Sequence, residues 1–447
     1  MNSVSLNIAK VYECDVFVAG GGVSGFSAAV GAARTGAKVI LCEADGYLGG
    51  SATRSFVGPF MTCYDRAEKN QIIKGIFEEV VQKLVSMNGA IYHTNCPGRD
   101  SYSGYRIHGH YGVTPFSMEA LKLALDEISQ DAGVKLLYHS RVVGCDVCND
   151  EIKTVYIASP AGLEAIKAKV FIDTTGNASM AASAGAETIF KDEDGFVQTA
   201  SMFFTITNVN KKKLEDAIGD SDDYRKRFFM DIFENAIETG EFPCGTVKLR
   251  IFEGMDDTWT VNMAQEDSIV VDFDTENLTN SEISQRKQIS EIYEFLKKHI
   301  PGLEDIKLIA SAPAIGVRES RRILGKTLLT KDDIQNSRYY DERICVCSNS
   351  IDVHLKKGVD YHVCENNYYI PLNCLISKNI SNLMGAGKTV SADKYAFSAV
   401  RVMPPCFAMG QAAGITSALA VLNNKKVLDV DVKDVQEIII ENGGYLG

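Results

Sequence analysis

The hydrophobic pattern is clearest near the amino terminus, where a short apolar run precedes a glycine-rich turn and a stretch of small residues. Residues 15–19 are mostly apolar, and the turn at 20–25 reads GGGVSG. An Ala-rich segment follows and ends at Arg34, and a second apolar run closes on Glu43. The pattern predicts a strand–helix–strand unit of about 30 residues.

Farther along the chain, the periodicity predicts helices and a group of strands. Apolar residues recur at helical spacing across 72–84 and, less regularly, across 121–128. The region 200–365 mixes strands with polar helices such as 282–299 and has no glycine motif of its own. Four strand-like segments predict a β-meander: 134–138, 141–147, 153–157 and 163–170.

The first glycine turn has the spacing of a dinucleotide-binding loop. Gly20 permits a tight turn, Gly22 lets a pyrophosphate approach the backbone, and Gly25 lets the helix lie close to the strand. The helix N-terminus then faces the diphosphate. Glu43 lies where an acidic residue accepts the ribose hydroxyls, and an acid without a nearby Arg disfavours a ribose 2′-phosphate.

Three further segments indicate that the dinucleotide is a flavin. Residues 47–53 read YLGGSAT, and the strand-like run 170–177 ends in Thr175 and Gly176. Near the carboxyl end, 382–387 reads NLMGAG, and 401–414 contains RVMPPC followed by MGQAAG. Together these segments resemble the FAD-dependent oxidoreductases related to the fumarate reductase and glutathione reductase flavoproteins, in the branch with an Arg-Val-Met-Pro…Met-Gly-Gln-Ala-Ala-Gly signature. The resemblance covers the outer parts of the chain better than the middle.

The resemblance implies an α/β fold, with a Rossmann-like FAD-binding domain of the glutathione reductase type and an inserted α+β substrate or cap domain. The FAD-binding domain is expected at 1–199 and 366–447, with 200–365 inserted. Besides Gly20, Gly22, Gly25 and Glu43, the residues expected to bind the cofactor are Val23, Ser24, Gly49, Gly50, Ser51, Thr53, Val142, Thr175, Gly176, Gly385, Gly387, Val402 and Met403.

Composition narrows the partners and the compartment. With 46 Lys and Arg against 58 Asp and Glu, the net charge is −12, which argues against a nucleic-acid partner. The apolar stretch 402–422 contains two Pro and Gln411, so we expect a buried helix rather than a membrane span. The amino terminus has no secretory pattern, and twelve cysteines without zinc or cluster spacing predict reduced thiols, no metal and a cytoplasmic location.

Two arginines are candidates for binding the substrate. Arg318, in the segment GVRESRR, resembles a family segment near the flavin and is the first candidate for a substrate-orienting cation; a solvated ion-pair cluster is an equal alternative. Arg401 precedes the proline-initiated helix, whose positive end can face the flavin N1–C2=O locus. Arg401 could raise the flavin potential in the same way or hold a substrate carboxylate.

Residues in three other segments are weaker catalytic candidates. His108 and His110 would share a face if extended and could supply a general base, although a structural role is favoured. Cys63 could be a redox thiol or a covalent anchor, although a small buried hydrophobe is favoured. Where relatives tend to carry a His-containing loop, this chain has Lys394 and Tyr395, and either could take that place.

The sequence therefore predicts an FAD-dependent oxidoreductase that transfers a hydride between a small organic substrate and flavin N5. Its partners would be that substrate and an electron acceptor or donor, and a homo-oligomer is left open. One alternative is a flavin-bearing electron-transfer subunit of a larger complex, as in heterodisulfide reductases. Another is a flavoprotein that keeps the cofactor only as a scaffold.

Overall fold

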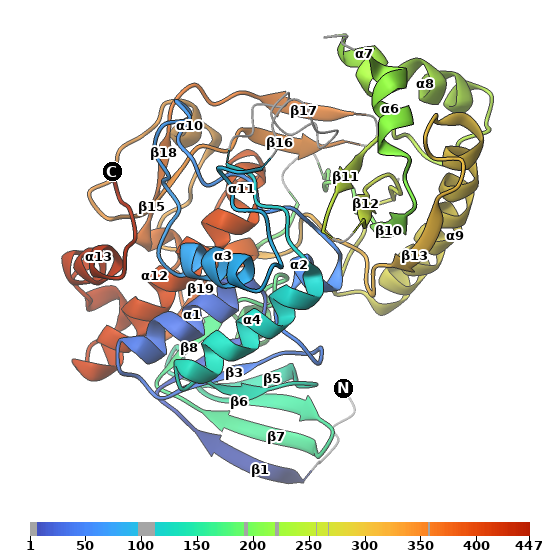
Figure 1. The fold of residues 1–447 in the computed structure, drawn as a ribbon. Coiled ribbons are helices and arrows are strands. Elements are labelled where there is room, and N and C mark those ends of the chain that lie inside the picture. The colour runs from blue at the N-terminus through green and yellow to red at the C-terminus, as the bar shows by residue number, and fades with distance from the viewer. Residues whose placement is uncertain are drawn as a thin grey trace.

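A five-stranded parallel sheet forms the centre of the computed structural model (Figure 1). The structure describes residues 7–96, 112–191, 195–219, 223–255, 257–266, 268–355 and 358–447. The strand order is β19-β8-β2-β3-β4. The bounds are β2 Val16–Ala19, β3 Val39–Cys42, β4 Lys135–Leu137, β8 Val170–Asp173 and β19 Leu383–Gly385.

Both faces of this sheet are covered, which explains why its strands are continuous apolar runs. Val16 and Val18 belong to a large hydrophobic cluster with residues of the helices, here called the main core. Phe17 and Ala19 point the other way and pack with residues of a second sheet. Alternate side chains of one strand thus support two layers.

The helical layer contains α1 (Val23–Arg34), α3 (Ile76–Ser86), α4 (Met118–Asp131) and α12 (Met403–Leu422) (Figure 1). Helix α12 is long and apolar enough to cross a membrane, but 78% of its most apolar window is buried inside the protein. Helices α1 and α12 pack with their backbones in close approach: a Cβ at Gly414 would lie 2.1 Å from the Ala28 carbonyl oxygen. The apolar surface of α12 is therefore used for packing.

The opposite layer is a four-stranded sheet with the order β1-β7-β6-β5. Its strands are β1 Ile8–Glu13, β5 Arg141–Cys148, β6 Glu151–Ser159 and β7 Gly162–Lys167. The prediction of a meander from 134 to 170 was wrong at its first strand, because β4 pairs in parallel with β3 in the central sheet. Instead β1 completes the layer by pairing in parallel with β7.

A second antiparallel sheet, β11-β12-β10-β13, lies apart from these layers and carries helices on one side (Figure 1). These elements are β10 Phe204–Thr207, β11 Ile251–Glu253, β12 Trp259–Val261, β13 Lys307–Ser311, α6 Lys211–Ile218, α7 Tyr224–Arg227, α8 Met230–Glu238 and α9 Thr275–His299. Its own hydrophobic cluster, here the second core, draws on residues from Ala200 to Ile315. Buried residues from Leu329 to Cys364 pack in the main core instead. The domain limits at 199 and 365, and a substrate or cap role for this unit, stay predictions.

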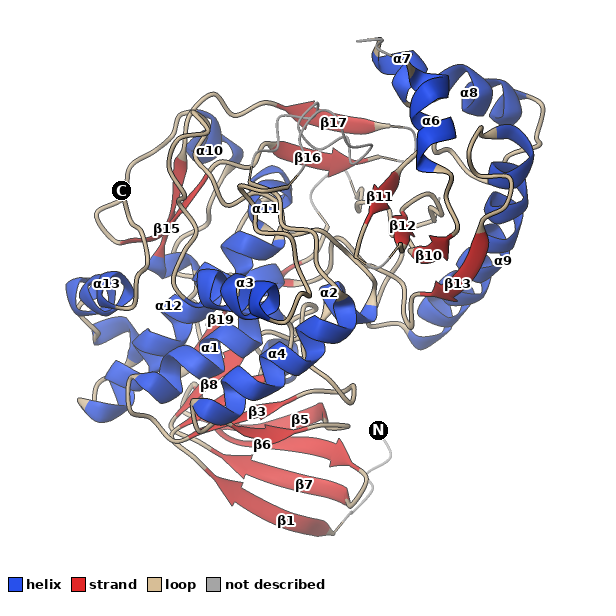
Figure 2. Ribbon diagram, viewed as in Figure 1, coloured by secondary structure: helices blue, strands red, loops and turns tan. Residues whose placement is uncertain are grey.

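Short elements connect the two parts (Figure 2). Three two-stranded pairs are β9–β14, β15–β18 and β16–β17. The remaining bounds are β9 Thr188–Ile189, β14 Arg322–Ile323, β15 Arg343–Cys347, β16 Ile351–His354, β17 Val359–His362, β18 Tyr368–Pro371, α2 Ser51–Arg54, α5 Ser179–Ser183, α10 Lys331–Gln335, α11 Lys394–Val400, α13 Val432–Glu441, η2 Leu372–Cys374, η3 Gly387–Thr389 and η4 Val427–Asp429.

Candidate functional site

The carboxyl ends of three parallel strands bring distant chain segments to one edge of the sheet. Strands β2, β8 and β19 run into the turns that carry Gly20, Thr174 and Gly387. The Thr174 hydroxyl donates to the carbonyls of Ala19 and Gly20, at 2.8 Å each. This edge is where open parallel sheets bind their ligands.

The glycine loop is compact because its backbone leaves no room for side chains. Gly20 has φ +98°, in the left-handed region, and a Cβ at Gly25 would lie 1.8 Å from the Gly20 carbonyl oxygen. The second glycine pair packs directly on this loop, since the N–H of Gly49 donates to the Gly21 carbonyl at 2.9 Å. The two motifs recognised in the sequence thus form one surface.

Glu43 closes the same loop from the end of β3. Its carboxylate accepts the N–H of Gly21 at 2.6 Å and the N–H of Asp45 at 2.9 Å. Burial raises the pKa of Glu43 above its ordinary value, and these two backbone N–H groups oppose that effect. The carboxylate therefore orders the glycine loop and retains lone pairs for a ligand hydroxyl.

Two helix N-termini meet beside this loop, and neither is capped. Helix α1 starts after Gly22 and α12 after Val402, and neither has a side-chain cap or an acidic residue in its first turn. The Ser24 hydroxyl joins them by donating to the Cys406 carbonyl at 2.8 Å. A buried helix end without a partner is rare, and an anion satisfies it. The backbone N–H groups at the two helix starts therefore fit a ligand with a pyrophosphate and an electron-rich ring edge.

The structure places the other predicted cofactor residues around this edge in different ways. Ser51 is exposed at the start of α2, and Met403 is buried at the start of α12. The Thr53 hydroxyl already donates to the Leu48 carbonyl at 2.8 Å, and the Val142 side chain packs between the two sheets. Thr175 donates to Asp173 Oδ1 at 2.7 Å. The assignment of these residues as cofactor ligands stays a prediction.

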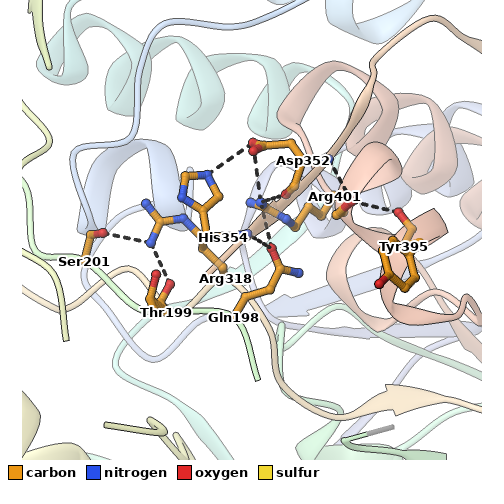
Figure 3. A network of polar contacts seen from close by, with 9 residues as sticks. Gln198, Thr199, Ser201, Arg318, Asp352, His354, Tyr395 and Arg401 are labelled. Carbon is orange, nitrogen blue, oxygen red and sulfur yellow. Dashed lines mark hydrogen bonds and ion pairs between the residues drawn. The ribbon is translucent and has the colours of Figure 1, made fainter. Parts of the chain in front are cut away.

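A charged cluster lies at the junction of the main core, the second core and α11; we call Arg250, Arg318, Arg401, Asp352 and His354 the arginine cluster. Figure 3 labels four of its members: Arg318, Arg401, Asp352 and His354. Asp352 and His354 alternate on β16 and therefore share a face, with His354 Nε2 3.2 Å from Asp352 Oδ2. Arg401, at the end of α11, lies 3.8 Å from the same oxygen.

Arg318 is held in place by the strand segment that leads into β10. Its Nη1 donates to the Thr199 carbonyl at 2.6 Å and to the Ser201 hydroxyl at 2.8 Å (Figure 3). Burial, and then the neighbouring charges of Arg401 and Arg250, lower the pKa of Arg318 to about 9. A cation in that environment is stabilised by any anion that reaches it.

Near neutral pH one of the two groups on β16 is charged and the other is neutral. Burial alone would raise the pKa of Asp352, but His354, Arg401 and Arg318 outweigh it and hold that pKa far below its usual range. Burial and the charge of Arg318 lower the pKa of His354 to about 3, so its imidazole is neutral. Asp352 nevertheless keeps 38% of its side-chain surface exposed.

The segment around Arg318 connects this cluster to the cofactor edge. Lys388 Nζ donates to the Val317 carbonyl at 2.5 Å, and Arg321 Nε donates to the Asn177 carbonyl at 3.0 Å. Glu319 and Arg322 form an ion pair at 2.7 Å with both side chains 0% exposed. The alternative of a solvated ion-pair cluster is therefore wrong for this pair.

Of the remaining catalytic candidates, Cys63 and Lys394 are buried side chains, and the Tyr395 carbonyl is linked to Asp352 through the Ser398 hydroxyl (Figure 3). Cys63 is fully buried in the main core, its Sγ 3.3 Å from the Gly112 carbonyl, and burial raises its pKa well above the ordinary value. Lys394 is buried with Nζ 5.0 Å from the centre of the Phe196 ring. His108, like its neighbour His110, lies outside the described residues.

Sequence reasoning missed Arg250, Asp352 and His354. None of them belongs to a motif, and each is separated from the glycine loops by a long stretch of chain. The available signal was the alternation of Ile351, Asp352, Val353 and His354, in which two ionisable residues share one face of an otherwise buried strand.

The parallel sheet, the double glycine loop and the paired helix ends define a dinucleotide-binding enzyme of the flavoprotein class. The sequence model described as FAD dependent oxidoreductase matches residues 15–439, and the chain belongs to this family. The protein is therefore an oxidoreductase with FAD as its cofactor. The narrower branch with the carboxy-terminal signature stays a prediction.

Solved structures are similar to this chain at low sequence identity. A geranylgeranyl bacteriochlorophyll reductase-like protein from Thermoplasma acidophilum is 13% identical, with a TM-score of 0.50 over 96% of this chain and 83% of that one. The p-nitrophenol 4-monooxygenase of Pseudomonas putida is 12% identical, with a TM-score of 0.47 over 97% and 85% of the two chains. No curated protein matches the chain.

Proposed function

We propose that this enzyme transfers a hydride between a carbon atom of a small organic substrate and flavin N5, with Arg318 and Arg401 orienting the substrate. FAD supplies the two-electron chemistry when bound. The observation that carries the proposal is the arginine cluster, because guanidinium groups with unused N–H donors gather beside Arg401, just before the start of α12. Substrate oxygens are natural acceptors for such donors.

The chain's own residues divide into binding and positioning groups. Arg318 is fixed through one nitrogen, Nη1, so its other N–H groups can donate to a substrate oxygen. Arg401 Nη2 donates to Gln198 Oε1 at 3.2 Å and to the Asp352 carbonyl at 3.1 Å, which fixes its direction. The Asp352 carboxylate reduces the repulsion between the two cations.

His354 is placed to hold a proton. Because its Nε2 faces the Asp352 carboxylate, we assign the imidazole N–H to Nε2, which leaves Nδ1 as an acceptor. A substrate hydroxyl can therefore donate a hydrogen bond to Nδ1 and be oriented by it.

The compartment and partners are part of the same proposal. All twelve cysteines are free thiols, which supports a reducing, cytoplasmic environment. The second partner is a small-molecule or protein electron acceptor or donor, and this partner is the source or sink of the hydride's electrons.

The test combines a spectrum with one matched pair of variants. Purified holoenzyme is titrated anaerobically with small organic acids and alcohols while flavin absorbance near 450 nm, where oxidised flavins absorb, is followed. We expect one compound class to bleach the flavin, and Arg318→Lys to slow bleaching about tenfold to a hundredfold, because a charge-assisted hydrogen bond contributes about 1.5–3 kcal/mol. Arg286→Lys, in an exposed pair on α9, is the control. Equal rates in Arg318→Lys and the wild type would contradict the role of Arg318.

A further inference from the structure

We infer that Cys345 and Cys347 form a redox-active dithiol, which a hydroperoxide oxidises to an intramolecular disulfide. The two residues alternate along β15, so their side chains lie on the same face of the strand. Their Sγ atoms are 3.4 Å apart, close enough for one thiol to donate a hydrogen bond to the other. The inference goes beyond the proposed function and does not depend on it.

The backbone beside the pair is irregular, which helps the two thiols to meet. β15 pairs with β18 in antiparallel fashion, and the register shifts between Arg343 and Cys345. A bulge or similar irregularity disrupts the ladder locally and lets a strand bend. An S–S bond is about 2.05 Å long, so the two sulfur atoms must approach each other further before it forms.

The pair is enclosed in the main core, which excludes large reagents. Cys345 and Cys347 are each 1% exposed. Burial raises the pKa of the Cys347 thiol, so the thiol form dominates and the pair stays reduced until an oxidant small enough to enter the core reaches it. In the part of the chain that the structure describes, no group of three or more His, Cys, Asp and Glu could hold a metal ion. Covalent chemistry between the two thiols is therefore favoured over metal binding.

The reaction consumes two thiols and one hydroperoxide. The thiolate of one cysteine attacks a peroxide oxygen, which gives a sulfenic acid as the O–O bond breaks and an alcohol, or water from hydrogen peroxide, leaves. The second thiol then attacks the sulfenic sulfur, so that the S–S bond forms and water leaves. The two sulfur atoms together lose two electrons, and the peroxide gains them. In a reducing compartment such a disulfide is transient.

The pair lies next to the helix that starts at the cofactor edge. β15 packs against α12, and Cys345, Cys347 and Phe407 belong to the same main core. Because protein interiors are close-packed, drawing two side chains of β15 together also shifts the groups that pack on them. We therefore expect closure of the disulfide to weaken FAD retention.

The experiment maps the thiols of the holoenzyme before and after treatment with excess hydrogen peroxide. Each sample is unfolded in iodoacetamide and digested with trypsin, which leaves Cys345 and Cys347 in one peptide, 344–356. We expect this peptide to be doubly alkylated before peroxide, and afterwards to be unalkylated and two hydrogens lighter than the dithiol. Cys374 is buried in the same core without a thiol contact among the described residues, and should be alkylated in both samples.

Cys345→Ala separates closure of the disulfide from its effect on the cofactor. This variant cannot close the pair, and Cys374→Ala, which keeps the pair and removes another buried thiol, is the matched control. After peroxide treatment and dialysis, we expect the wild type and Cys374→Ala to retain less FAD than Cys345→Ala. Peroxide reaches the other cysteines in all three proteins, so the difference reports on the pair alone.

Each contrary outcome overturns a defined part of the inference. A 344–356 peptide that is still doubly alkylated, in a sample whose exposed Cys148 has been oxidised, rejects the dithiol. A sulfinic acid on Cys345 or Cys347 in place of the disulfide rejects it as well. Equal FAD retention in the peroxide-treated wild type and Cys345→Ala rejects the connection to α12.

Discussion

His354 is held neutral by its surroundings, although its partner Asp352 is ionised. The positive charges of Arg318 and Arg250 disfavour a further positive charge on the imidazole. At the scale of single residues, the folded site is therefore under electrostatic strain. Its surroundings disfavour the protonated form of His354, and unfolding or a bound anion reduces this cost.

This strain predicts a specific dependence of stability on pH. The pKa of His354 is about 3 in the folded chain and about 6.5 in an unfolded one. Between these values the unfolded chain binds a proton that the folded chain does not, so the free energy of unfolding falls as pH falls from about 6.5 towards about 3. Asp352, whose folded pKa is depressed, adds to the loss below its unfolded value of about 3.9.

The measurement is urea unfolding at a series of pH values. His354→Asn is expected to flatten the dependence by up to one proton within this window. His139→Asn, at an exposed position that already has a positive φ of +52°, serves as the control. If the free energy of unfolding of His354→Asn depends on pH as steeply as that of the wild type, the histidine is protonated in the folded protein.

At the scale of elements, the α1–α12 pair joins the two ends of the chain and brings both uncapped helix starts to one place. The close approach depends on small residues along both helices, and Gly414 against Ala28 is the tightest backbone contact between them away from the turn. The packing therefore couples the fold of the amino-terminal unit to that of the carboxy-terminal helix.

Gly414→Ala tests this coupling. The added methyl group would meet the Ala28 carbonyl at 2.1 Å, so the helices must separate, and we expect a loss of about 1–3 kcal/mol in unfolding free energy together with weaker FAD retention. Gly144→Ala on β5, where the nearest atom is 3.8 Å away, is the control and should change stability little. Thermal unfolding and the flavin-to-protein ratio give the two readouts, and wild-type values for Gly414→Ala would refute the packing argument.

At the scale of the whole molecule, the cofactor edge is assembled from segments that begin near residues 20, 49, 175, 386 and 402. Binding FAD therefore adds contacts between parts of the chain that packing and hydrogen bonds already hold together. A ligand that binds the folded state alone stabilises it in proportion to the logarithm of its concentration.

Removal of FAD is consequently expected to lower the melting temperature. Adding FAD back at a hundred times its dissociation constant should restore about 2.7 kcal/mol. Glu43→Ala should shift this restoration to higher FAD concentration, since it removes the carboxylate that orders the glycine loop. NAD⁺ at the same concentration is the ligand control. A melting temperature that FAD does not move would contradict a cofactor site spanning both chain ends.

The sequence by itself determined the parts that depend on neighbours along the chain. The strand, glycine turn, helix and acid of 15–43 are one local unit, and the proline-initiated helix after Arg401 is another, so periodicity and turn chemistry identify them. Only the tertiary structure decided which sheet β4 joins and that Arg250, Arg318 and the β16 pair meet. Strand pairing and charge clustering are contacts between residues far apart in the chain, and their free energy depends on burial that no local pattern encodes.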